Sequence, residues 1–193
     1  PMHDTGNNQT LFDRADLQAT AVDTIRLNLF FARSWFQTPN TFDQDAAGQD
    51  QRQKILSFNI APGWVRVLNA HSTLTVNPYL RQDQVLYTPS RNPFADDTAT
   101  VAQDRRLTNA GVKGDYAWVA GHHNIKTGVQ LQHTFLTESF SLGITDPTYV
   151  ADSGAPGLAA WDLTAKGTPF RFHGHADLKE YSLYFQDNLT FGH

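Results

Sequence analysis

The stretch EYSLYFQDNLTF, residues 180–191, decides the fold class of this chain. Its odd positions are mostly apolar and its even positions mostly polar, as in a β-strand whose side chains point alternately to two faces. Asp187 is the carboxylate that interrupts the apolar side. We expect a turn to begin at Gly192–His193, about 10 Å from Asp187 along a tilted strand, so that this charge reaches water.

Six further stretches alternate in the same way: residues 10–19, weakly, then 24–36, 54–68, 73–87, 103–119 and 124–142. The alternation predicts that one face carries the apolar residues Ile25, Leu27, Leu29, Leu56, Phe58, Leu74, Val76, Val129 and Leu131. It predicts that the other face carries Arg26, Asn28, Asn77, Lys126 and Gln130. A slip of one residue would move a whole strand's side chains to the wrong face, so the assignment is specific.

The connections between these stretches alternate in length. Short turns are expected near residues 21–24, 69–72 and 120–123, and long polar loops at 37–53, 88–102 and 145–176. The stretches are longer than the roughly 5–6 residues of typical strands in globular proteins. Long strands with short turns at one end and long loops at the other are typical of outer-membrane barrels.

Aromatic residues fall near both ends of the expected strands. We expect Trp35, Phe36, Tyr87 and Tyr181 near the loop-side membrane boundary. We expect Trp64, Tyr116, Trp118 and Phe191 near the turn-side boundary. Amphipathic rings gather at the two interfaces of a bilayer. The sequence therefore predicts an all-β, up-and-down antiparallel transmembrane β-barrel segment of about seven strands over residues 1–193, incomplete and not closed on its own. A soluble β-sandwich or β-solenoid is the alternative.

Composition excludes several classes of function. The 193 residues carry a formal net charge of −4 and include no cysteine, which excludes disulfides and thiolate chemistry. No basic run marks a nucleic-acid interface, so no nucleic-acid partner is expected. The sequence has no run of 18 apolar residues, so no transmembrane helix is expected. We expect no cofactor.

Three stretches resemble the β-barrel of TonB-dependent outer-membrane receptors: GDYAWVAGHHNIKTGVQLQHTFLTESFSLGI (114–144), EYSLYFQDNLTF (180–191) and TIRLNLFFARSWFQTPN (24–40). The subgroup with an N-terminal carboxypeptidase-regulatory-like domain is the most similar. The resemblance implies a non-enzymatic receptor in the outer membrane of a Gram-negative-type cell, which takes up a scarce, large solute with energy supplied through TonB. No plug domain or closing strand is recognised, so we expect an interior slice of the barrel. Its partners would be outer-membrane lipid and, through parts outside the chain, TonB and the solute. A passive porin or an adhesion barrel is the alternative.

The long loop predicted at 145–176 is the candidate ligand-binding region. It carries Tyr149, Trp161, Phe170, Arg171 and Phe172, and exposed aromatic rings beside an arginine suit ligand capture. Packing of one loop against another is the alternative reading of the same residues.

Metal-binding and catalytic motifs are weak. His122–His123 and the pair His173 and His175 have no third ligand at an informative spacing, so no metal site is expected. No G-x-S-x-G elbow is present, and we read Glu138 and Glu180 as solvated rim charges rather than a catalytic pair. We expect no catalytic residue.

Overall fold

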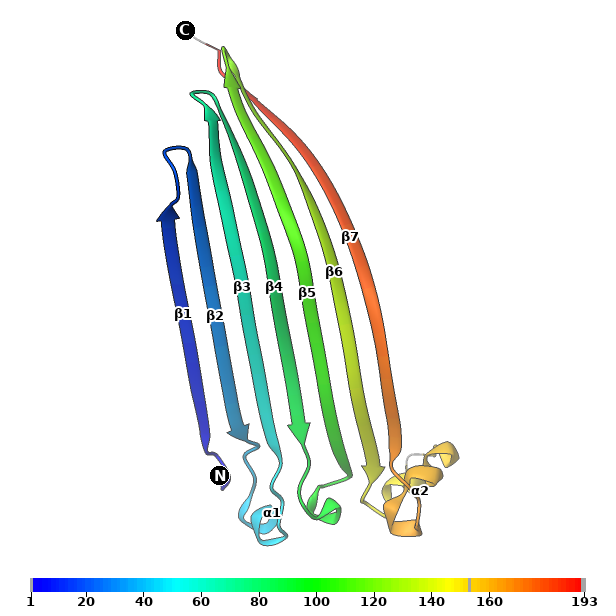
Figure 1. Cartoon of the computed structure of the whole chain (residues 1–193). Helices are drawn as coiled ribbons and strands as arrows, with labels where there is room; N and C mark the ends of the chain where they lie inside the picture. Colours follow the sequence, from blue (N-terminus) through cyan, green and yellow to red (C-terminus); the bar gives the residue numbers. More distant parts are fainter. Residues whose placement is uncertain (1, 153, 192–193) are drawn as a thin grey trace.

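A computed structural model describes residues 2–152 and 154–191, and its strands form one open antiparallel sheet (Figure 1). The strands are β1 (Gly6–Gln18), β2 (Asp23–Gln37), β3 (Arg52–Asn69), β4 (Ser72–Thr88), β5 (Ala99–Ala120), β6 (His123–Ile144) and β7 (Phe170–Leu189). Their order in the sheet is their order in the chain, and within the described residues β1 and β7 do not pair. The all-β, up-and-down, unclosed seven-stranded fold is thus confirmed. The turn expected at Gly192–His193 lies outside the described residues.

The strands are longer than predicted, above all β7. This strand begins at Phe170, whereas the alternation placed its start near residue 180. Residues 170–179 also alternate, but their apolar residues Phe170, Phe172 and Leu178 stand at even positions, whereas those after residue 180 stand at odd positions, so the alternation that begins at residue 180 does not extend to them. They nevertheless pair with β6, since Phe172 faces Phe140 and Lys179 faces His133. Tyr181 therefore lies within β7, opposite Leu131, rather than at the start of the strand.

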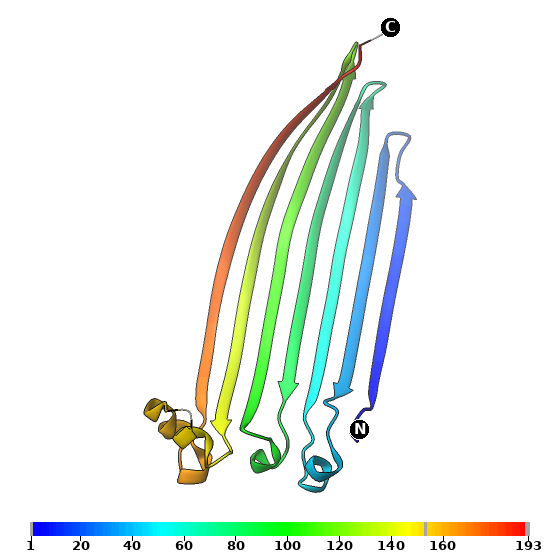
Figure 2. The ribbon, with the colours of Figure 1, turned by 180° about the vertical axis from the view of Figure 1, so that it is seen from behind.

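Short and long connections lie at opposite ends of the sheet, as predicted. Residues 19–22, 70–71 and 121–122 form the short turns. The other end carries the short helical segments α1 (Phe42–Ala46), η1 (Pro93–Ala95), α2 (Tyr149–Asp152), η2 (Pro156–Trp161) and η3 (Leu163–Ala165). Figures 1 and 2 show these segments beyond the strand ends rather than over either face of the sheet. We call the two ends of the sheet turn-side and loop-side.

Strand register assigns every side chain to one of two faces. Leu29 lies opposite Ile60, which lies opposite Leu80, which lies opposite Ala110. We call this surface the Leu29 face and its reverse the Asn28 face. The register places all nine predicted apolar residues on the Leu29 face and all five predicted polar residues on the Asn28 face, so the predicted sharing of faces is confirmed.

A continuous apolar band crosses the Leu29 face. It consists of Ile25, Leu27, Leu29 and Phe31 in β2; Leu56, Phe58, Ile60, Pro62 and Trp64 in β3; Leu74, Val76, Pro78 and Leu80 in β4; Ala110, Val112, Tyr116 and Trp118 in β5; Ile125, Val129 and Leu131 in β6; and Tyr181, Leu183 and Phe185 in β7. It spans residues 25–31 in β2 and 56–64 in β3, or about 23–30 Å along a strand. Asp13 of the edge strand β1, opposite Leu29, interrupts it.

The band is inclined to the rows of paired residues. Phe31 begins it in β2, and the row through Phe31 reaches Asp177 in β7. In β7, however, the band begins at Tyr181, four residues nearer the turns. A horizontal apolar layer crosses tilted strands in this stepwise manner, since each strand meets it at a different residue.

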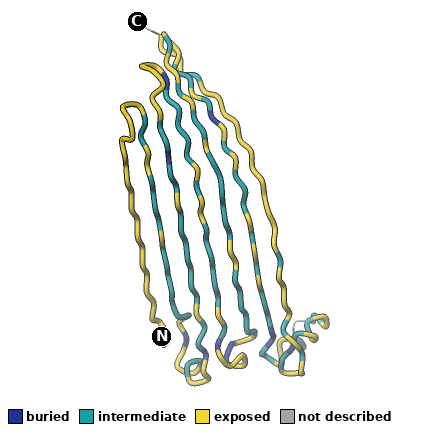
Figure 3. The backbone as a smooth tube through the Cα atoms, viewed as in Figure 1, coloured by how far each residue is buried: buried dark blue, intermediate teal, exposed yellow. Residues whose placement is uncertain are grey.

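Almost no side chain is buried. Ala95 and Ile144 are the buried apolar residues of the described chain, and both lie at the loop side. Figure 3 shows strands that are mostly half-buried in the middle of the sheet and exposed at its edges. The apolar band consequently has no second protein layer packed against it within the described residues.

Candidate functional site

A row of aromatic and amide side chains crosses the loop-side end of the Asn28 face. Register links its members from strand to strand in the order Phe36, Gln53, Tyr87, Gln103, Phe140 and Phe172. We call it the aromatic row. Aromatic rings offer flat apolar surface, and amides offer donors and acceptors, so the row can hold a ligand that has both kinds of surface.

Ring contacts join the aromatic row to the longest loop. The Phe170 ring lies 6.4 Å from the Phe140 ring and 5.3 Å from the Trp161 ring, which it meets edge to face. Such aromatic pairs stabilise by more than the area they bury. The loop is further held by a bridge between Ile144 and Asp162. The 145–169 loop is therefore docked on the end of the sheet.

Local hydrogen bonds shape the two ends of this loop. The Thr148 backbone N–H donates to the Asp146 carboxylate at 2.9 Å, and the Thr148 hydroxyl donates to the same oxygen at 2.8 Å. These bonds hold the pKa of Asp146 below its ordinary value, the backbone bond contributing most. Asp162 caps the next turn in the same manner, accepting from the backbone and the hydroxyl of Thr164.

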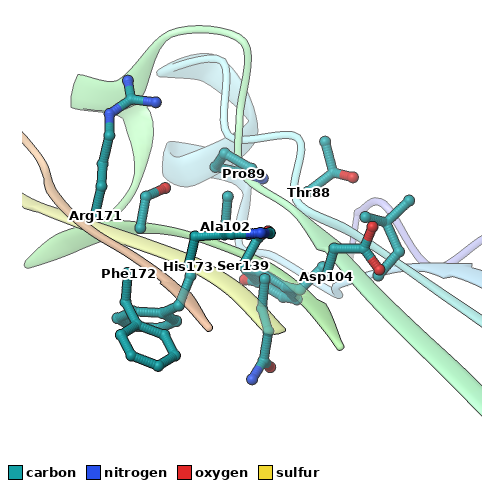
Figure 4. Close-up of a pocket in the computed structure, with 13 residues that line it drawn as sticks. Thr88, Pro89, Ala102, Asp104, Ser139, Arg171, Phe172 and His173 are labelled. Atoms are coloured by element: carbon teal, nitrogen blue, oxygen red, sulfur yellow. The ribbon is translucent and has the colours of Figure 1, made fainter. Parts of the chain in front are cut away.

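The structure divides the five predicted ligand residues among different surroundings. Trp161 and Phe170 are in contact, and Phe172 belongs to the aromatic row. Arg171 points to the Leu29 face, away from Phe172, as Figure 4 shows. Tyr149 is exposed in α2 and has no ring contact within the described residues. Phe170, Arg171 and Phe172 lie in β7, so the prediction that they belong to a loop was wrong.

Sequence reasoning missed Phe140, Tyr87 and Gln103. Both Phe140 and Tyr87 lie in predicted strands, but only Tyr87 has a predicted role, that of a boundary marker, and Phe140 has none. The missing signal was cross-strand register, because it alone shows that these side chains stand in one row with Phe172.

Polar side chains cover the Asn28 face between the aromatic row and the turns. Arg105 donates to Glu138 at 2.8 Å, and Gln103 donates to the same carboxylate at 2.7 Å. Tyr79 reaches across β5 to donate to Gln132, while Tyr184 reaches across β6 to donate to Asp115. This face is a connected polar surface.

Glycines make room for the two tyrosines. A Cβ at Gly111 would lie 2.5 Å from the Tyr79 ring, and one at Gly128 would lie 2.4 Å from the Tyr184 ring. Each tyrosine therefore lies flat over a glycine of the neighbouring strand. Glycine is the residue that permits so close an approach.

A depression of about 490 Å³ lies near the loop side, lined by residues of β4–β7 (Figure 4). Ala102, Ser139 and Ser141 are its small central residues, with Leu86 on one side and His173 on the other. Register puts Leu86, Ser139 and His173 in one row of the Leu29 face. Its central part thus opens on the opposite side of the sheet from the aromatic row.

The histidine and carboxylate candidates have local partners. His123 Nδ1 lies 2.6 Å from Asp187, so the charge that interrupts the last strand faces an imidazole across β6 and β7. His173 Nδ1 lies 2.8 Å from the Ser139 hydroxyl. Glu138 and Glu180 are separated, because they lie opposite Gly174 and Gln132, respectively. In the described part of the chain, no three such side chains gather as a metal site.

Comparisons with known proteins add no family assignment. No protein-family model matches the chain, and no curated protein matches it. Across residues 2–152 and 154–191, no helix has the length and apolar character needed to cross a membrane.

Proposed function

We propose that the chain forms part of the wall of an outer-membrane receptor for energised solute uptake, of the TonB-dependent kind that its sequence resembles. The observation that carries the proposal is the inclined apolar band on the Leu29 face. Its extent of about 23–30 Å along the strand, reduced by strand tilt, approaches the roughly 25 Å apolar belt of outer-membrane barrels.

Hydrogen bonding and burial support the same function. A strand can cross hydrocarbon only if its backbone groups are paired, and five of the seven strands have a neighbour on both sides. Within the described chain no protein layer covers the band, whereas the reverse face carries ion pairs and amides. Lipid on the Leu29 face and water or a polar plug on the Asn28 face account for this difference.

The aromatic row and the docked 145–169 loop occupy the place where a solute would first meet the inner wall. We assign them to ligand capture, with Phe140, Phe172 and Trp161 as the principal surfaces. The proposed role of these residues is binding, which does not require them to break a chemical bond.

The two alternative functions fit the fold less well. A β-sandwich needs a second sheet over the apolar residues, and the described strands form one sheet. A porin is favoured by a charged loop folded inward as a constriction, whereas the described loops lie beyond the strand ends (Figure 2).

Fluorescence quenching by brominated lipids tests the proposal. The chain would be folded into phospholipid vesicles as variants that each keep one of Trp64, Trp118 or Trp161. We expect brominated acyl chains to quench Trp64 and Trp118, which bound the band, and to leave Trp161 bright. Equal quenching of all three, or a monodisperse chain in buffer without detergent, would contradict the proposal.

A further inference from the structure

The loop-side margin of the apolar band carries basic residues. Moving along each strand from the band toward the loops, the Leu29 face presents Arg33 in β2, Lys54 in β3, Arg106 in β5 and Lys179 in β7. We call these four residues the basic belt. They lie two to four residues beyond the last apolar position of their strands.

The basic belt has no carboxylate partners. No ion pair within the described residues involves Arg33, Lys54, Arg106 or Lys179, although Arg33 donates to the Asn7 amide at 2.8 Å. The two nearby carboxylates are engaged elsewhere: Asp104 accepts from Gln84 and Asp177 contacts His133. In the described part of the chain, the four cations of the belt are therefore free of direct ion pairs, and they outnumber the two carboxylates beside them.

Cations on the Asn28 face behave differently. Arg14, Arg26, Arg81, Arg105 and Lys113 each lie 2.7–3.6 Å from a carboxylate. The turn-side margin of the band is also paired, since Arg66 lies 3.7 Å from Asp23 and His123 lies 2.6 Å from Asp187. Within the described residues, Lys126 is the strand cation of the Asn28 face without an ion pair, whereas all four cations of the basic belt lack one.

We propose that the basic belt binds the phosphorylated headgroups of lipids in the loop-side leaflet, whose acyl chains cover the apolar band below it. This inference rests on the proposed function. Phosphate is an anion that Arg and Lys bind well, and a basic residue beside an anionic membrane surface contributes to attachment. The asymmetry of the two margins implies two leaflets of unlike headgroup charge.

Vesicle distribution and lysine labelling test the belt together. The full chain would be folded in the presence of neutral phosphatidylcholine vesicles and vesicles that also contain phosphatidic acid. We expect about tenfold enrichment on the second kind at low salt, falling as salt screens the charges. Phosphatidic acid should also protect Lys54 and Lys179 from an amine-acylating reagent, while Lys126 on the Asn28 face stays reactive.

Two variants distinguish the loss of positive charge from a loss of folding. Replacing the belt with glutamine (R33Q/K54Q/R106Q/K179Q) should abolish the enrichment, whereas R33K/R106K should retain it. If the glutamine variant does not fold, the labelling of the unmodified chain still decides.

Several outcomes would contradict the proposal that the basic belt binds phosphorylated headgroups. Equal enrichment on vesicles made anionic by oleate would show that phosphate is not recognised. Protection of Lys54 and Lys179 by inorganic phosphate in detergent would indicate a site for a free anion. Absence of any preference would leave the belt to another occupant, such as an acidic protein. A chain that inserts into no vesicle would instead refute the proposed function.

Discussion

The turn-side half of the sheet and its loop-side end distribute polar and apolar side chains in opposite ways. In the turn-side half, Leu29, Ile60 and Val112 form the apolar face, and the reverse carries Asn28, Tyr79 and Lys113. At the loop-side end, the Leu29 face carries Arg33, Lys54 and Ser139, whereas the reverse carries the aromatic row.

This exchange shows that the same face of a strand is not apolar over its whole length. An apolar face is favourable where it meets hydrocarbon, and a polar face where it meets water. A strand that passes from one surrounding to another must exchange its pattern at the boundary. The exchange occurs near Phe31 and Arg33 in β2, and near Tyr181 and Lys179 in β7.

The largest expected effect comes from a charge placed in the band. Leu29→Arg should destabilise the membrane-inserted protein by about 2–4 kcal/mol, the cost of arginine at the bilayer midplane. Asn28→Arg, one residue away on the other face, should cost much less. Urea unfolding of both variants in vesicles measures the difference, and equal costs would show that the two faces are misassigned.

A smaller effect should come from the glycine contacts of the polar face. Gly128→Ala introduces a Cβ at 2.4 Å from the Tyr184 ring and 2.7 Å from the Gly114 carbonyl oxygen. Such overpacking should cost about 1–3 kcal/mol and displace Tyr184 from Asp115.

Gly114→Ala is the matched control for this substitution. Its nearest neighbour would be Val129 at 3.8 Å on the Leu29 face, an ordinary contact. We expect a change within about 0.5 kcal/mol. Comparable costs for both alanines in the same unfolding titration would mean that Tyr184 moves aside readily.

Much of the sheet could be predicted from the sequence, because alternation over long strands fixes which residues share a face. The turns and the residues of the band followed from this one signal. Residues 170–179 were not recognised as strand because the phase of the alternation reverses between Leu178 and Tyr181, so a pattern followed from residues 181–191 ends there. The aromatic row could not be predicted for another reason. Alternation describes a single strand, whereas the row is formed by residues that the register of six strands brings side by side.

Loop docking should depend modestly on the ring contact between Trp161 and Phe170. Trp161→Ala should lower the free energy of local opening of the 145–169 loop by about 0.5–1.5 kcal/mol, read from hydrogen exchange at Ile144 and Asp162. Tyr149→Ala, which removes an exposed ring without a ring contact, should leave exchange at these residues unchanged. If both variants open the loop equally, the docking does not depend on the ring contact.

The smallest expected effect is a pH dependence confined to the start of this loop. Because the folded pKa of Asp146 lies below its ordinary value of 3.8, the turn gains stability that is complete above that value. This stability is lost as the pH falls through the folded pKa, when the carboxylate is protonated and accepts less strongly from Thr148. An NMR titration of the Thr148 amide proton should therefore show a midpoint below 3.8. Asp146→Asn should abolish the titration, since its side chain still accepts a hydrogen bond but carries no charge. A midpoint at or above the ordinary value, or an unchanged titration in the asparagine variant, would assign the effect to another group.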